Sequence, residues 1–202
     1  MLVAEVDPKV SREDLILDAA DQLLARYGFR KMTIDDLARE AGIGKGTVYL
    51  HFRSKEDVVL SHVDRIVKRL VARLREIAST DGAPAAKLRE MLVLRVMFRF
   101  DSVQHYTESF SEVLRDLRSA LLQRRQNHFE EEAKVLSAVL REGQRAGAFR
   151  RHEALATART LVLASNSLLP FSLSTQELGK RREVEQAAGR IADLVLEGLV
   201  AR

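Results

Sequence analysis

Apolar side chains recur at intervals of three and four residues along most of this chain, which is the spacing of one face of an α-helix. The first such run begins after Ser11, which can cap a helix, and ends at Gly28, which can stop one. No segment alternates strictly between apolar and polar residues, so we expect no sheet. The pattern predicts an all-α chain of about nine helices, the later ones at residues 33–41, 44–50, 54–77, 84–100, 104–119, 121–146, 153–169 and 181–201.

The composition is that of a folded protein. The chain has 202 residues, of which 46% are hydrophobic, and this is enough to bury a core. Because it has no cysteine, it can form neither a disulfide framework nor a thiolate metal site. Residues 1–10 lack the basic and apolar regions of a signal peptide, and no stretch approaches the length of a membrane-spanning helix. We therefore expect a cytoplasmic protein without a membrane span.

Residues 33–52 have the pattern of a helix-turn-helix, a motif that binds DNA. Two short amphipathic segments meet at Gly42, and the second begins with Gly44 and Gly46, whose small size would let the backbone approach base edges. Lys45 is placed to reach a guanine. The residues expected to contact DNA are Thr33, Gly44, Lys45, Gly46, Thr47, Tyr49, His51 and Lys55.

These residues have different expected roles. Thr47 can hydrogen-bond to a base or touch a thymine methyl, whereas Tyr49 and His51 are placed for phosphates. Thr33 and Lys55 each stand at the start of a helix, where a side chain and the N-terminal amides can hold a phosphate together. Two simpler interpretations stay open. Tyr49 could be half-buried and only pack against its neighbours, and His51 could be a solvated surface side chain.

The net charge gives DNA binding little support. The whole chain carries +4, but residues 1–57 contain 9 lysines and arginines against 11 acidic residues. The basic footprint that would mark the whole domain as a nucleic-acid binder is therefore absent. The prediction depends on where a few residues lie.

Residues 11–60 resemble the N-terminal domain of the TetR family of bacterial repressors. The resemblance covers about a quarter of the chain, and a three-helix head followed by a long fourth helix also fits the family. The residues that carry it are Tyr27-Gly28-Phe29, Thr33-Ile34, Leu37-Ala38, Ala41-Gly42-Ile43, the run from Gly44 to Tyr49, His51-Phe52 and Lys55-Glu56.

The resemblance implies a DNA-binding transcriptional regulator, usually a repressor, although an activator would have the same head. Members usually form homodimers through their last two helices, bind near-palindromic operators of double-stranded DNA, and respond to a small-molecule effector in the C-terminal domain. We predict that the chain is divided into a flexible arm (1–10), a helix-turn-helix domain (11–57) and a ligand-binding and dimerisation domain (58–202). The alternative is a helix-turn-helix protein without a small-molecule ligand.

The last two predicted helices carry more apolar surface than one core stripe each requires. Leu161 and Leu168 on the first of them, and Leu194 and Leu196 on the second, lie beside the main stripes. Because such a surplus would be exposed in a monomer, we expect it to pair two copies of the chain. Two-fold symmetry would then place the recognition helices about one DNA turn, or a multiple of it, apart.

Aromatic and methionine side chains gather near the middle of the chain and indicate an apolar ligand pocket, although core packing accounts for each of them singly. Such a lining favours an apolar or aromatic ligand, and Arg95, Arg99 or Arg115 could hold a carboxylate if they point inward. If the helix that begins at Ser54 borders the pocket, its tilt would move the DNA-binding heads. The residues expected to line the pocket are Ile66, Leu70, Leu94, Met97, Phe98, His105, Tyr106, Phe110 and Asn166.

No motif for catalysis or metal binding stands out. Arg124, Arg125, His128 and the acidic run 130–132 do not form a set of metal ligands, and there is no glycine-rich phosphate loop or nucleophile motif. A helical enzyme would need titratable residues that converge on one site. We therefore expect no enzymatic activity, no cofactor and no metal.

Overall fold

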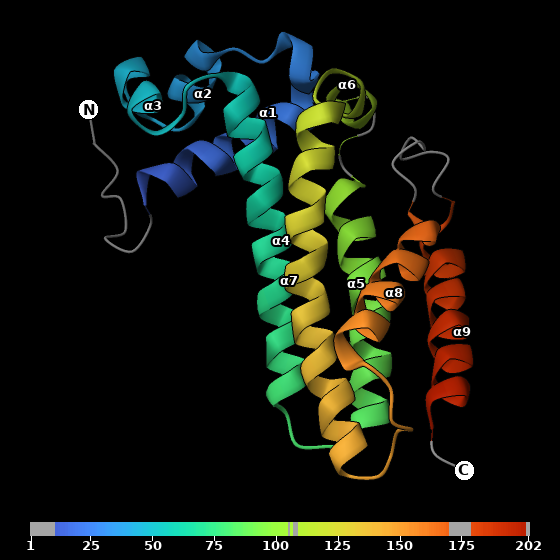
Figure 1. The fold of residues 1–202 in the computed structure, drawn as a ribbon. Helices are drawn as coiled ribbons and strands as arrows, with labels where there is room; N and C mark the ends of the chain where they lie inside the picture. Colours follow the sequence, from blue (N-terminus) through green and yellow to red (C-terminus); the bar gives the residue numbers. More distant parts are fainter. Residues whose placement is uncertain (1–10, 105, 107–108, 170–178, 201–202) are drawn as a thin grey trace.

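The computed structural model describes residues 11–104, 106, 109–169 and 179–200, and within these ranges the chain is helical and contains no β-strand. One isolated β-bridge joins Phe149 to Val200. The predicted all-α class is thereby confirmed, while the predicted arm at 1–10 lies outside the described residues. The helices (Figure 1) are α1 (Arg12–Lys31), α2 (Ile34–Glu40), α3 (Lys45–His51), α4 (Lys55–Ser79), α5 (Pro84–Val103), α6 (Ser109–Asp116), α7 (Arg118–Arg145), α8 (Ala154–Ser165), the 3-10 helix η1 (Asn166–Leu168) and α9 (Arg181–Leu199).

Local signals set the helix ends in the N-terminal head. The Ser11 hydroxyl accepts a hydrogen bond from the backbone N–H of Asp14 at 3.0 Å and caps α1. Gly28 breaks α1 with a φ of 81°, a conformation that favours glycine, and one short turn follows the break. Thr33 and Asp36 form a reciprocal capping box at the start of α2. The helix starts and the break at Gly28 therefore lie where the sequence predicts them.

The head shares its core with the rest of the molecule. Leu37 and Val48 are fully buried among α1, α2 and α3. The same apolar cluster continues to Val113 on α6 and Leu121 on α7, and α6 packs directly on α1 (Figure 1). The predicted domain boundary after residue 57 falls inside the continuous helix α4, so the division into domains stays a prediction.

Three long helices, α4, α5 and α7, lie side by side and form the centre of the body (Figure 1). α8 packs against α7, and α9 packs against α5. Among the described helices, none is long and apolar enough to cross a membrane. The fully buried leucines contributed by the three central helices are Leu70, Leu74, Leu88, Leu136 and Leu140.

The middle of the chain departs from the predicted helix limits. The helix expected at 104–119 is represented by the shorter α6, and α7 begins at Arg118 rather than at residue 121. Leu117 stands between them, buried, and caps α7 with no side-chain hydrogen bond. Because packing rather than a glycine or a capping residue places this bend, the sequence held no local signal for it.

Candidate DNA-binding surface and ligand cavity

Helix α3 buries one side and exposes the other. Val48 is fully buried, whereas Tyr49 and Leu50 are 52% and 84% exposed. A Cβ atom added at Gly46 would meet no atom within 4 Å, so the backbone is bare at that point. An exposed helix face with no side chain at Gly46 can lie close to base edges in the major groove.

Lys45, in the first turn of α3, reaches back to α2. Its Nζ donates a hydrogen bond to the Asp35 carboxylate at 2.9 Å, and this bond raises the pKa of Lys45. Both side chains are about half exposed, so the pair is a weak one that the ammonium can leave for a base or a phosphate. Thr47 is partly buried beside it and His51 is exposed at the far end of the helix.

Thr33 and Lys55 are already occupied by contacts within the chain. The Thr33 hydroxyl is part of the capping box with Asp36. The Lys55 ammonium donates to three backbone carbonyls, those of Phe29 at 3.1 Å, Arg30 at 3.2 Å and Met32 at 3.2 Å. Lys55 therefore ties the end of α1 to the start of α4, which sequence reasoning did not foresee. Contact of either residue with DNA stays a prediction.

Leu50 is a candidate that sequence reasoning passed over. It is the most exposed large apolar side chain among the described residues, and it lies on the recognition helix. Its neighbours Val48 and Phe52 are both buried, so the helical spacing alone places position 50 off the core side. A leucine there can touch thymine methyl groups.

Helix α4 holds the head through Arg65. This largely buried arginine lies 2.8 Å from the Asp18 carboxylate and donates to the backbone carbonyl of Asp14 at 3.2 Å. Both acids belong to α1, one helical turn apart. The ion pair therefore fixes the first helix of the head to the helix that enters the body.

A second connection runs through a buried histidine and a tyrosine. Arg65 donates to His62 Nδ1 at 3.4 Å, so His62 carries its proton on Nε2 and donates to the Tyr106 hydroxyl at 2.7 Å. The Tyr106 hydroxyl in turn donates to the Asp21 carboxylate of α1. Burial, together with that hydrogen bond, raises the pKa of Tyr106 far above its usual range, so the hydroxyl keeps its proton.

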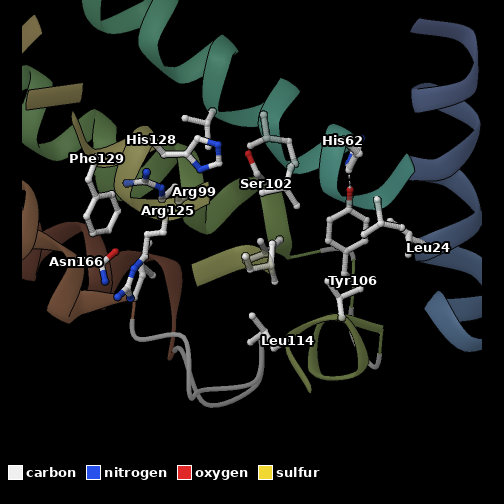
Figure 2. A pocket seen from close by; sticks show the side chains of 18 residues that line it. Leu24, His62, Arg99, Ser102, Tyr106, Leu114, Arg125, His128, Phe129 and Asn166 are labelled. Carbon is white, nitrogen blue, oxygen red and sulfur yellow. Dashed lines mark hydrogen bonds between the residues drawn. The ribbon is translucent and has the colours of Figure 1, made fainter. Parts of the chain in front are cut away.

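A cavity of about 160 Å³ lies where α4, α5, α6 and α7 meet beneath the head (Figure 2). Tyr106 forms part of its wall beside α1, and Leu24 of α1 lines it as well. Most of the wall is apolar, and its apolar members include Val59, Val63, Ile66, Val103, Leu114 and Leu121.

Three of the predicted pocket residues, Ile66, Tyr106 and Asn166, line this cavity. Others do not, because Leu70 is buried in the body core, Leu94 and Phe98 pack against that core, and Met97 packs on the α9 side. His105 and the side chain of Phe110 lie outside the described residues. Whether any of these residues touches a ligand stays a prediction.

The face of α5 explains the difference. Arg99, Ser102 and Val103 line the cavity at helical spacing, and this face is rotated away from the predicted one. Sequence reasoning also missed the residues of α7 that line the cavity, Leu121, Arg125, His128 and Phe129. Successive members of this set are four, three and one residues apart, which places them on one helix face, and this pattern can be recognised in the sequence.

Two arginines, Arg99 and Arg125, line one end of the cavity (Figure 2). Arg95 and Arg99 both bond to the carboxylate of Glu132, which is completely buried. Burial lowers the pKa of the Arg95 guanidinium to about 10. The guanidinium groups of Arg95, Arg99 and Arg125 lie 5.3, 5.6 and 5.5 Å from the centre of the Phe129 ring. Nowhere in the described part of the chain do three or more potential metal ligands gather.

A helix-turn-helix head whose recognition helix exposes one face, set on a helical body, defines a DNA-binding transcriptional regulator. Residues 16–61 match the family model described as "Bacterial regulatory proteins, tetR family". The fatty acid metabolism regulator protein of Bacillus subtilis is 26% identical over 74% of this chain and 77% of its own length. The transcriptional repressor KstR2 of Mycobacterium tuberculosis is 32% identical, but the match spans only 48% of this chain and 46% of that protein.

Among solved structures, a transcriptional regulator from Cytophaga hutchinsonii has the same fold. The TM-score is 0.78 at 18% identity, with 93% of this chain and 98% of that chain covered. Residues 16–61 are therefore a DNA-binding domain of the TetR family, and the sequence matches support a TetR-family transcriptional regulator.

Proposed function

We propose that this regulator represses transcription as a homodimer and leaves a near-palindromic operator when a small, mainly apolar molecule enters the cavity. One observation carries the proposal: the cavity wall includes Leu24 of α1 and Tyr106, whose hydroxyl is bonded to Asp21 of α1. A molecule in the cavity would therefore touch the head itself as well as the body.

The size of the cavity supports a coupled movement. Its 160 Å³ is close to the roughly 150 Å³ that holds a benzene-sized molecule, and below the roughly 300–1,000 Å³ of most ligand sites. A ligand larger than one ring would have to push the walls apart, and α4 is one of those walls. Since a long helix moves nearly as a rigid body, the head would move with it. A preference of about 1–3 kcal/mol for the displaced state would change DNA affinity roughly 5- to 150-fold.

The names of the relatives support the same proposal. The Bacillus subtilis protein is named as a regulator of fatty acid metabolism, and the mycobacterial protein as a repressor. Carried over to this chain, they favour repression and a lipid-like effector, which the apolar lining of the cavity would accept. We further propose that the protein acts by binding and not by catalysis, in the cytoplasm, where operator DNA is found.

Apolar exposure on the last two helices supports the dimer. Leu163 on α8 and Leu194 on α9 are 63% and 68% exposed. Leu161, expected among the surplus, is instead buried within the subunit, and Leu168 and Leu196 are partly buried. A second copy of the chain that covered Leu163 and Leu194 would remove this apolar surface from water.

A cavity-filling variant tests the proposal without a known ligand. Val63→Phe adds a ring inside the cavity, and Lys68→Phe adds the same ring on the exposed side of the same helix. After an operator has been selected from random duplexes, we expect Val63→Phe to bind it roughly 5- to 150-fold more weakly and Lys68→Phe to bind it like the wild type. A folded Val63→Phe variant with wild-type affinity would count against ligand control and favour a regulator without a small-molecule ligand.

A further inference from the structure

The polar groups of the cavity are concentrated at one end. Arg99, Arg125, His128 and Asn166 gather around Phe129, while Leu24 and Tyr106 lie at the opposite end, next to the head (Figure 2). The Tyr106 hydroxyl is engaged by His62 and Asp21, so that end offers a ligand a mainly apolar surface. The cavity is therefore suited to a molecule that differs at its two ends.

We infer that the effector is an apolar monocarboxylate whose carboxylate faces Arg99 and Arg125 and whose apolar body points toward Leu24 and Tyr106. The inference rests on the proposed ligand control of DNA binding and adds the chemical class of the ligand.

The charge balance at this end supports an anion. Arg95 and Arg99 share the single carboxylate of Glu132, which leaves one positive charge more than that carboxylate can balance. Arg125 brings a third guanidinium to the same ring. A positive charge taken out of water is stabilised by a bound anion.

The donor geometry of arginine also supports a carboxylate, since Arg99 and Arg125 both line the cavity. Arginine presents its donors in a planar fork that matches a carboxylate. A phosphate dianion would bring two negative charges to a cavity that is otherwise apolar, so a monocarboxylate fits the balance better.

Octanoate and 1-octanol test this assignment, because they share one chain and differ in charge. We expect wild-type protein to bind octanoate at least about tenfold more tightly than 1-octanol in calorimetric titrations, as a charge-assisted hydrogen bond implies. Arg125→Gln should remove that preference and leave 1-octanol binding unchanged. Arg73→Gln, on the exposed part of α4, is the matched control and should keep it.

Arg99→Gln should behave like Arg125→Gln, but it also removes a partner of the buried Glu132, so Arg99→Lys is measured beside it as a variant that retains the charge. We expect Arg99→Lys to keep part of the octanoate preference.

Equal binding of octanoate and 1-octanol by the wild type would overturn the anion-binding end while leaving ligand control intact. An octanoate preference that survives in Arg125→Gln and Arg99→Gln would also overturn it. If neither compound bound, this inference would fail, and the result of Val63→Phe would decide separately whether the cavity controls DNA binding.

Discussion

The hydroxyl of Tyr106 donates a hydrogen bond to the carboxylate of Asp21, so a side chain in the cavity wall is bonded to the first helix of the DNA-binding head. His62 on α4 donates to the same hydroxyl at 2.7 Å. Three segments therefore meet at one oxygen atom: the first helix of the head, the helix that leads into the body, and the segment between α5 and α6. Any ligand that moves Tyr106 has to strain or break these two bonds.

Removal of the Tyr106 hydroxyl should uncouple the cavity from the head. Tyr106→Phe removes the hydroxyl that bonds to both His62 and Asp21, and it leaves the buried Nε2–H of His62 with the Asp21 carboxylate at 3.4 Å, so we expect the free energy of unfolding to fall by about 1–3 kcal/mol. The ratio of operator affinities without and with ligand should fall toward one, because the two hydrogen bonds that would transmit a movement of the cavity wall to the head are absent. Denaturant unfolding and DNA titrations with and without octanoate measure the two effects.

Asp21→Asn is the control for that prediction. Its amide oxygen can still accept the hydrogen bond from Tyr106, so ligand coupling should survive. Full coupling in Tyr106→Phe, or equal loss in both variants, would show that this hydroxyl does not transmit the ligand signal.

Lys45 and Tyr49 should affect DNA binding in different ways. Lys45→Ala should weaken operator binding by about 1–3 kcal/mol and relax base preference, whereas Tyr49→Phe should weaken binding to all sequences alike. Binding to the selected operator and to a scrambled duplex separates the two. Lys68→Ala, which removes an exposed lysine of α4, is the control, and wild-type affinity in both variants of α3 would refute the assignment of this helix.

The pair between Lys45 and Asp35 gives a prediction of opposite sign. Asp35→Asn releases the ammonium from its carboxylate partner and removes a negative charge beside the DNA. We expect tighter binding to both the operator and the scrambled duplex, with the gain reduced at high salt. Weaker binding would mean that Asp35 positions Lys45 rather than competing with DNA for it.

Two glycines should respond to alanine with opposite changes in stability. A Cβ added at Gly143 on α7 would lie 2.1–2.9 Å from ring atoms of Phe149, so Gly143→Ala should cost about 1–3 kcal/mol of unfolding free energy. At Gly46 the space is open, and Gly46→Ala should add about 0.5–1 kcal/mol of stability while weakening DNA binding, because the methyl group stands on the surface that approaches the bases. A Gly46→Ala variant with wild-type DNA affinity would contradict that close approach.

The proposed dimer depends on two exposed leucines. Leu163→Glu combined with Leu194→Glu should give a monomer at micromolar concentration, since two carboxylates would have to be buried in the interface. Leu50→Glu replaces an even more exposed leucine on α3 and should leave the mass in light scattering unchanged. A double variant that stays dimeric would move the interface away from these side chains.

The sequence by itself determined the helices of the head and the motif they carry. Ser11, Gly28, Thr33 and Gly42 act on the backbone within a few residues of themselves, so their effects are readable without the rest of the fold. For the same reason the helix-turn-helix pattern could be recognised at residues 33–52, where each position needs only its local spacing to be interpreted.

Only the tertiary structure decided which faces meet. Helical periodicity marks apolar stripes, but it does not say which of two stripes on α5 borders a cavity, and the structure selects Arg99 and Ser102 rather than Met97 and Phe98. Lys55 bonds to carbonyls more than twenty residues earlier in the chain, and Glu132 is buried between two arginines of another helix. Such contacts arise from the packing of distant segments, and no local pattern encodes them.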